Sequence, residues 1–253
     1  MRILYQLTSP MDKTIGPQEV RRRQQVIQDY AADGTAVVAE PTATGPAAIE
    51  NARDAAIVVP ELLRLGPVAQ DRGFDAMIIG CYSDPGIEAL REILRIPVVG
   101  PGGASLHVAA QLGTRISVLT PAGRGFGRLA ARLRALALEP LLASVRPIGL
   151  SVMDLAQQRS GALDKATQAA RDAVEQDGAD VLVLGCMSMA FLPRICEVLT
   201  DRAGAPVVNP VTAALKTAEM LVTMGLSQSK VAYATPGAAA ATPSRPRAAG
   251  EHA

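Results

Sequence analysis

Short apolar runs alternate with amphipathic stretches along most of the chain. The apolar runs are rich in Val, Ile and Leu and mostly lack polar alternation, which is typical of parallel strands covered by helices on both faces. They predict strands at residues 2–7, 35–39, 76–80, 98–100, 116–120, 181–185, 207–209 and 231–234. Helical patterns between them predict helices at residues 17–33, 55–72, 86–94, 104–112, 125–138, 162–176 and 211–224. This order of elements predicts an α/β fold with parallel sheets and right-handed crossovers.

The chain contains an internal repeat with a spacing of about 105 residues. Residues 73–81 (GFDAMIIGC) match residues 178–186 (GADVLVLGC), and residues 96–101 (IPVVGP) match residues 205–210 (APVVNP). An Ala-rich helical pattern follows each copy of the second block. Because the matched blocks keep the same order, they share more than any two α/β segments would. We therefore expect two similar α/β halves that face each other with pseudo-twofold symmetry.

The last block of the repeat, residues 230–236, matches residues 115–121 and has the same sequence pattern as the opening segment, residues 2–10. We therefore expect the C-terminal segment to return and complete the first half. The predicted first domain is residues 1–100 plus 210–236, and the predicted second domain is residues 101–209. Residues 237–253 have low complexity and are expected to form a disordered tail, so we place no site there, His252 included.

Composition and charge narrow the class of protein. Apolar residues make up 49% of the 253 residues, which is enough for a substantial core, and the formal net charge is +1. Such a balance predicts no nucleic-acid or membrane partner, and we interpret the run Arg21-Arg22-Arg23 as the solvated face of a helix. The absence of a signal-like N-terminus or an apolar run of about 20 residues predicts a cytoplasmic protein.

Two of the three cysteines, Cys81 and Cys186, occupy equivalent positions of the repeat, each directly after an apolar strand that ends in glycine. Ligands bind beyond the carboxyl ends of parallel strands, so two facing edges would place one sulfur on each side of a bound molecule. Inversion of a carbon acid needs a base on one face and an acid on the other, and a thiol with an ordinary pKa of about 8.5 can serve as either. A helix expected to start near Ser83-Asp84-Pro85-Gly86 would favour the Cys81 thiolate.

The remaining candidate residues support other chemistries poorly. Cys196 has no counterpart in the repeat and is expected in the core, and His107 lies in an apolar helical pattern. One histidine outside the tail gives neither a Cys/His pair nor a metal site. The glycine-rich stretches 100–103 and 123–127 fit neither a dinucleotide fingerprint nor a phosphate-binding loop, and we interpret both as loops. We therefore expect no metal and no nucleotide cofactor.

Residues 80–86 (GCYSDPG) and 184–189 (LGCMSM) carry a resemblance to the aspartate/glutamate/hydantoin racemase superfamily, and within it to the hydantoin and allantoin racemases. The resemblance covers roughly residues 1–235, with further similarity at residues 45–50, 176–180 and 225–230. It implies two flavodoxin-like domains with the substrate between them, no cofactor and a homo-oligomer. It also implies that Cys81 and Cys186 exchange acid and base roles for the two enantiomers.

The resemblance implies that the substrate is a 5-substituted hydantoin or an allantoin-like ureide. The C5 proton of such a compound is acidified by the adjacent carbonyl. Removing that proton gives an enolate, which hydroxyl and backbone N–H groups can stabilise. The expected substrate-binding residues all lie in strand-end loops: Ser9, Tyr82, Ser83, Thr120, Met187 and Ser188.

Two loops depart from the pattern of hydantoin racemases. Residues 7–10 read Leu-Thr-Ser-Pro where the family usually has Asn-Pro-Asn-Thr, and residues 101–104 read Pro-Gly-Gly-Ala where it usually has Glu-Ala after the strand. Two other activities of the superfamily therefore stay open, a maleate-type cis–trans isomerase and a decarboxylase, although decarboxylase-like members lack the first cysteine. A non-catalytic two-lobed binding protein is the alternative from another class.

Overall fold

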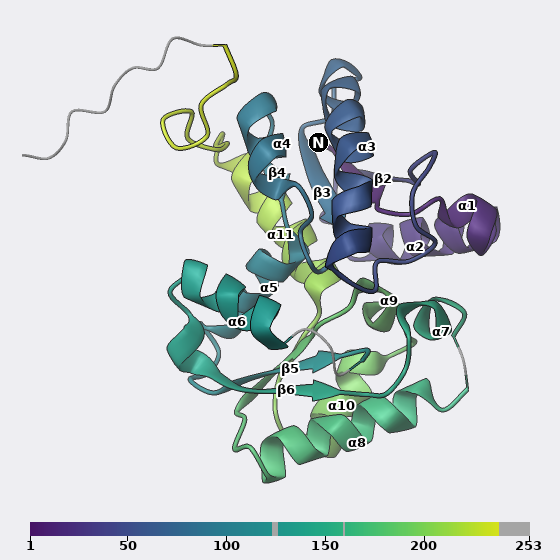
Figure 1. Ribbon diagram of the computed structural model, residues 1–253, viewed down its shortest axis with the longest axis vertical. Helices are drawn as coiled ribbons and strands as arrows, with labels where there is room; N and C mark the ends of the chain where they lie inside the picture. The colour runs from purple at the N-terminus through teal and green to yellow at the C-terminus, as the bar shows by residue number, and fades with distance from the viewer. Residues whose placement is uncertain (123–125, 159, 238–253) are drawn as a thin grey trace, which may run out of the picture.

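The computed structural model describes residues 1–122, 126–158 and 160–237 and consists of two four-stranded parallel sheets flanked by helices (Figure 1). The first sheet has the order β2-β1-β3-β4, and the second has the order β6-β5-β7-β8. The strands are β1 (Arg2–Leu7), β2 (Ala36–Glu40), β3 (Ala76–Gly80), β4 (Val98–Val99), β5 (Ile116–Thr120), β6 (Leu142–Pro147), β7 (Val181–Leu184) and β8 (Val207–Val208). The predicted α/β fold with parallel sheets is confirmed, and the two sheets repeat one topology.

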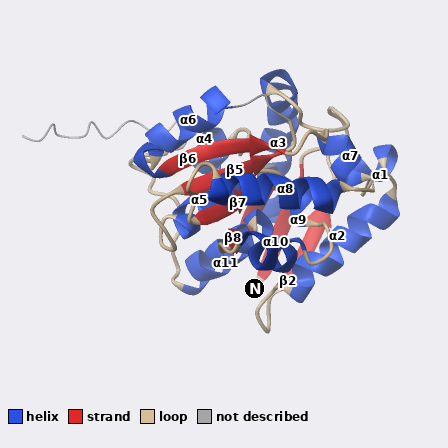
Figure 2. Ribbon diagram, turned by 90° about the horizontal axis from the view of Figure 1, so that it is seen from below, coloured by secondary structure: helices blue, strands red, loops and turns tan. Residues whose placement is uncertain are grey.

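Helices cover both faces of each sheet. The longer ones are α2 (Pro17–Asp29), α3 (Ala52–Asp71), α4 (Ile87–Ile93), α5 (Pro101–Ala109), α6 (Phe126–Ala135), α8 (Ala162–Glu175), α10 (Ile195–Ala203) and α11 (Pro210–Thr223). The short ones are α1 (Met11–Thr14), α7 (Val152–Ala156), α9 (Met187–Ala190) and the 3₁₀ helix η1 (Glu139–Leu141). Figure 2 shows α8 and α10 over the second sheet, where the two helices pack together.

The two halves meet at α5 and α11, which pack against each other. Helix α5 follows the first sheet but packs on β7 and β8, whereas α11 follows the second sheet and packs on β3 and β4. The chain thus crosses between the halves after each sheet. The proposed division into residues 1–100 plus 210–236 and residues 101–209 stays a prediction.

The alternation of strand side chains divides the core. In β1, Ile3, Tyr5 and Leu7 belong to a large buried cluster that continues into the second half, whereas Leu4 belongs to a smaller cluster with α3 and α4. All four side chains are at most 1% exposed. The interface between the halves is therefore part of one continuous core rather than a solvated gap.

The expected strand at residues 231–234 is wrong, because this segment forms turns. The position beside β4 is instead filled by side chains: the Gln228 amide accepts from Val98 N and donates to Val98 O, and Lys230 Nζ donates to the carbonyls that end α4. The segment thus lies against the first half without extending its sheet. Conversely, β6 was not predicted, because this half-buried edge strand lacks a continuous apolar run.

The interpretation of residues 100–103 as a loop is also wrong, because they form the N-cap and first turn of α5. Pro101 stands at the first helical position, where a proline loses no hydrogen bond. The Asp84 carboxylate accepts the N–H groups of Gly102 and Gly103, both at 2.9 Å. Gly102 is needed because a Cβ there would collide with the Tyr82 carbonyl.

Two predictions lie largely outside the described residues. Residues 123–125 of the glycine-rich stretch 123–127 are not described, and of the predicted tail, residues 237–253, only Gly237 is described. None of the helices in the described ranges combines the length and apolar character that a membrane crossing requires.

Candidate active site

A cavity of about 340 Å³ lies where the carboxyl ends of the two sheets meet. Part of its polar wall is formed by residues at the carboxyl ends of β1, β3, β5 and β7, the two inner strands of each sheet. The expected catalytic and substrate-binding residues all line it: Ser9, Cys81, Tyr82, Ser83, Thr120, Cys186, Met187 and Ser188. The fold therefore brings together, at the ends of four separate strands, the residues that the repeat and the resemblance singled out.

Cys81 follows β3 directly, and its Sγ lies 3.1 Å from the Ser83 Oγ. Burial raises the pKa of the Cys81 thiol, while the hydroxyl and backbone N–H of Ser83 act in the opposite direction. The expected helix N-terminus does not reach this thiol. Helix α4 begins only at Ile87, after a turn through Asp84, which has a φ of +49°. The expectation that a helix N-terminus favours the Cys81 thiolate is therefore wrong.

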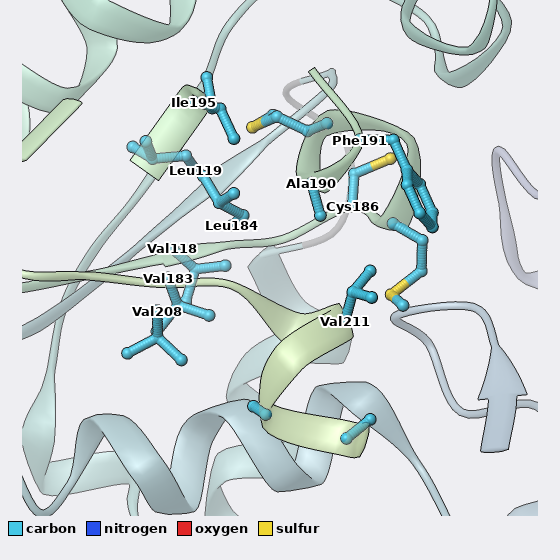
Figure 3. Close-up of a cluster of buried hydrophobic side chains, with 14 of the residues drawn as sticks. Val118, Leu119, Val183, Leu184, Cys186, Ala190, Phe191, Ile195, Val208 and Val211 are labelled. Carbon is cyan, nitrogen blue, oxygen red and sulfur yellow. The ribbon is translucent and has the colours of Figure 1, made fainter. Parts of the chain in front are cut away.

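Cys186 is the N-cap residue of α9 and is only 5% exposed. Burial raises the pKa of its thiol to about 11, although the backbone N–H groups of Ser188 and Met189 lower it. Figure 3 shows Cys186 beside Phe191 and Ala190 at the edge of the second half's core. A charge on Cys81 raises the pKa of Cys186 further, so the two thiols are in electrostatic range of each other. One thiolate in this cavity opposes formation of the second.

Two arginines in the cavity wall, Arg23 and Arg132, were missed by the sequence analysis. Arg23 belongs to the run interpreted as a solvated face, but it is 2% exposed and donates to Glu19 and to Ser188. Arg132 donates to the backbone carbonyls of Tyr82 and Ser83 in the Cys81 loop. A usable signal was present for Arg23, since it precedes the buried Ile27 by four positions and therefore shares its helix face.

A third unpredicted group is the phenol of Tyr5, in the middle of β1. Its hydroxyl is buried, and among the described residues it has no hydrogen-bond partner. Burial raises its pKa far above the ordinary value, and charges on Arg23, Cys81 and Cys186 all influence it. The hydroxyl is therefore within electrostatic range of both thiols.

The hydroxyls of the site differ in availability. Thr120 Oγ1 donates to the Ala122 carbonyl, and Ser188 Oγ lies 3.2 Å from the donating Arg23 Nη2. Because Ser188 only accepts in that contact, its own proton stays available to a ligand. Ser9 is buried just after β1, and the Ser83 hydroxyl is hydrogen-bonded to Cys81 Sγ, a contact in which either group can be the donor. Ser188 and Ser9 are thus better placed to donate than Thr120.

The rest of the cavity wall is mainly apolar. Met11 and Ile15 line it from the first half, and Leu129, Val152 and Ala156 line it from the second. At the rim, Glu50 of the first half accepts the backbone N–H of Val152, at 2.8 Å, and so caps the start of α7 in the second half. The loop of residues 45–51 is in this way attached across the mouth of the cavity.

Other candidate residues lie outside the cavity. The exposed His107 ring shares a 2.8 Å hydrogen bond with the Gly103 carbonyl of its own helix, and Cys196 is a half-buried free thiol packed against the core. Within the described ranges, no group of three or more His, Cys, Asp or Glu side chains could hold a metal ion.

Two α/β halves of one topology, with a thiol after the equivalent strand of each, form the arrangement that the resemblance to racemases implied. The family model for Asp/Glu/Hydantoin racemase matches residues 19–218, and the chain belongs to this family. It is 34% identical over 204 residues to the hydantoin racemase of Paenarthrobacter aurescens, covering 80% of this chain and 85% of that protein.

Two solved structures are similar over nearly their full length. The allantoin racemase from Klebsiella pneumoniae superposes with a TM-score of 0.85 at 30% identity, covering 93% of this chain and 94% of the other. The allantoin racemase from Pseudomonas fluorescens has a TM-score of 0.83 at 32% identity, covering 94% of this chain and 97% of the other.

Proposed function

We propose that the protein racemises 5-substituted hydantoins, with Cys81 and Cys186 as the acid and base on opposite faces of the C5 carbon. The observation that carries this proposal is that both thiols line one cavity from equivalent strand ends. Hydantoin and allantoin racemases among its relatives support the substrate class, since allantoin is itself a hydantoin with a ureido group at C5.

The reaction begins with one cysteine as thiolate and the other as thiol. The thiolate takes the C5 proton, and the electron pair of the C–H bond moves into the adjacent carbonyl to form an enolate. The opposing thiol then gives its proton to C5 from the other face, so the product is inverted and the negative charge has moved to the second sulfur. Exchange of protons with water restores the starting state, and the opposite enantiomer uses the two cysteines in reversed roles.

Hydrogen-bond donors in the cavity wall support the enolate. Ser188 and Ser9 are the hydroxyls best placed to donate to its oxygen, and such preorganised donors stabilise developing charge strongly in a site shielded from water. Because the substrate carbonyl already acidifies the C5 proton, the proposed chemistry requires no cofactor. Function as a cytoplasmic homo-oligomer stays a prediction.

The apolar wall favours substrates with an apolar group at C5. Met11, Ile15, Leu129 and Val152 offer no hydrogen bonds to a ureido group, whereas an alkyl or benzyl group would gain from burial there. We therefore expect higher kcat/KM for an alkyl- or benzyl-hydantoin than for allantoin.

The test is incubation of one enantiomer of a 5-substituted hydantoin with the protein in D2O. We expect loss of optical rotation together with deuterium at C5 of the inverted product. An enzyme that leaves the rotation and the C5 proton of hydantoins and of allantoin unchanged would contradict the proposal. Turnover of maleate or of an arylmalonate would then identify one of the other superfamily activities.

A further inference from the structure

Arg23 is a side chain of the first half that holds the cysteine loop of the second half. It projects from α2, is 2% exposed, and donates through Nη2 to Ser188 Oγ at 3.2 Å, two residues after Cys186. Its guanidinium carbon lies 4.7 Å from the centre of the Phe191 ring, in the same second half. Glu19, one turn earlier in α2, accepts from Arg23 Nε at 2.8 Å and fixes the direction of the side chain.

Arg132 makes the reciprocal contact. It projects from α6 of the second half and donates through Nη1 and Nη2 to the carbonyls of Tyr82 and Ser83, which follow Cys81. Its Nη1 lies 3.4 Å from the Asp84 carboxylate, and its guanidinium carbon lies 5.9 Å from the centre of the Tyr82 ring. Arg132 therefore contacts three consecutive residues of the loop that carries the first thiol.

The two arginines stand on equivalent helices. Helix α2 lies between β1 and β2 in the chain, and α6 lies between β5 and β6, which are the corresponding strands of the second sheet. Each arginine contacts the segment after one inner strand of the opposite sheet, β7 for Arg23 and β3 for Arg132. Each also places its charge over an aromatic ring of that loop region, Phe191 or Tyr82. The pseudo-symmetry thus extends from the thiols to their supports.

We propose that Arg23 and Arg132 are reciprocal positioning residues, each of which holds the cysteine loop of the opposite half, so that each thiol is set for proton transfer only when the two halves are docked. This proposal rests on the proposed function for the use of the thiols. The contacts on which it stands are independent of any substrate.

The charges around each thiol make the proposal measurable. Cys186 faces Arg23, Cys81 and Tyr5, together with the N–H groups of Ser188 and Met189, and Arg23 lowers its pKa. Cys81 faces Arg132, Asp84, Ser83, Tyr5 and Cys186, and there Arg132 lowers the pKa while Asp84 raises it. Loss of one arginine should therefore raise the pKa of one thiol, the one in the opposite half.

The rate of racemisation alone cannot tell which thiol is affected. The two enantiomers have equal free energy, so kcat/KM must change equally in both directions. The experiment is therefore alkylation of the full-length protein with iodoacetamide across a pH series, with the rate at each cysteine measured by peptide mass spectrometry. This readout needs no substrate, so a failure of the proposed function would leave it unaffected.

We expect Arg23→Gln to raise the alkylation midpoint of Cys186 by about one pH unit, a roughly tenfold loss of thiolate below the midpoint, with little change at Cys81. Arg132→Gln should show the reverse selectivity. Arg21→Gln on α2 and Arg134→Gln on α6 are the matched controls, since Arg21 is exposed and Arg134, in the described part of the chain, pairs with Glu139 of its own half. Neither control should move either midpoint.

The lysine variants separate charge from shape. Arg23→Lys should keep the alkylation midpoint of Cys186 close to its wild-type value, since lysine retains the positive charge. Arg132→Lys should restore the midpoint of Cys81 less completely, since lysine lacks the planar guanidinium that donates to two carbonyls at once. Circular dichroism would verify that each variant is folded. If a glutamine variant does not fold, the corresponding lysine variant takes its place in the test. The proposal is overturned if the folded variants shift both thiols equally, shift neither, or shift no more than the controls.

Discussion

Gly80, the last residue of β3, and Gly185, directly after β7, occupy the same position of the repeat. A Cβ added to either would lie 2.8 Å from a carbonyl oxygen of the neighbouring central strand, Gln6 O for Gly80 and Leu119 O for Gly185. Each glycine immediately precedes a cavity cysteine. The close approach of the backbones therefore fixes where each thiol emerges from its sheet.

This relationship predicts that Gly80→Ala and Gly185→Ala will each displace a strand end and with it a thiol. We expect a loss of about 1–3 kcal/mol in the free energy of unfolding, the usual range for overpacking, and a larger proportional loss of racemisation. Urea unfolding and a polarimetric assay measure the two effects. Gly127→Ala is the control, because its Cβ would meet no atom within 4 Å. Equal, small effects at all three positions would contradict the account.

Activity should depend on pH through the two cavity thiols, the half-buried Cys81 and the buried Cys186. Burial raises the pKa of both, that of Cys186 to about 11, so at neutral pH both are mostly protonated. Because the reaction needs one thiolate, kcat/KM should rise about tenfold per pH unit from neutral pH until the first thiol is ionised. It should fall at still higher pH, where the second thiol also loses its proton. A profile that is flat from about pH 6 to 8 would show that a thiolate is already present in the free enzyme.

The buried hydroxyl of Tyr5 predicts an effect on stability. With no partner among the described residues, it has lost its hydration without a compensating hydrogen bond. Tyr5→Phe should therefore unfold at an equal or higher urea concentration, with a gain of up to about 1 kcal/mol. A loss of more than that amount would show that the hydroxyl has a partner in solution, such as a water molecule or one of the thiols.

The contact between Glu50 and α7 predicts an effect on substrate binding. Glu50→Gln removes a carboxylate from a helix N-terminus and weakens the attachment of the rim loop, at a cost in stability of about 1 kcal/mol or less. Since Glu50 holds the rim loop and is neither the proposed acid or base nor a donor to the enolate, KM should rise more than kcat falls. Glu175→Gln, at the exposed end of α8, is the control. A fall in kcat with unchanged KM would argue against a role at the rim.

The positions of the thiols could be predicted because they depend on local pattern and on repetition. An apolar strand that ends in glycine places the next residue at a sheet edge, and the matched blocks place two such residues in equivalent halves. The same reasoning failed for residues 231–234. Sequence similarity to an opening strand carried no information about the β4 edge, where Gln228 already binds both backbone groups of Val98.

The spacing to Ile27 could indicate that Arg23 is buried, but the role of the two arginines could not be assigned from local pattern, because it depends on how the halves dock. In the run Arg21-Arg22-Arg23, adjacent residues point in different directions around the helix, so Arg21 is exposed while Arg23 is buried. Arg132 contacts residues about 50 positions earlier, across the interface between the halves. Such contacts follow from the packing of α2 and α6, on which one sequence gives little information.

The two-thiol mechanism is tested most directly by single cysteine variants in D2O. We predict that Cys81→Ser and Cys186→Ser each lower racemisation of a 5-substituted hydantoin by at least about 100-fold, since a serine hydroxyl is too weak an acid to replace a thiol. Cys196→Ser, outside the cavity, should keep wild-type inversion with deuterium at C5 of the product. Full racemisation with deuterium incorporation in either of the first two variants would contradict the account.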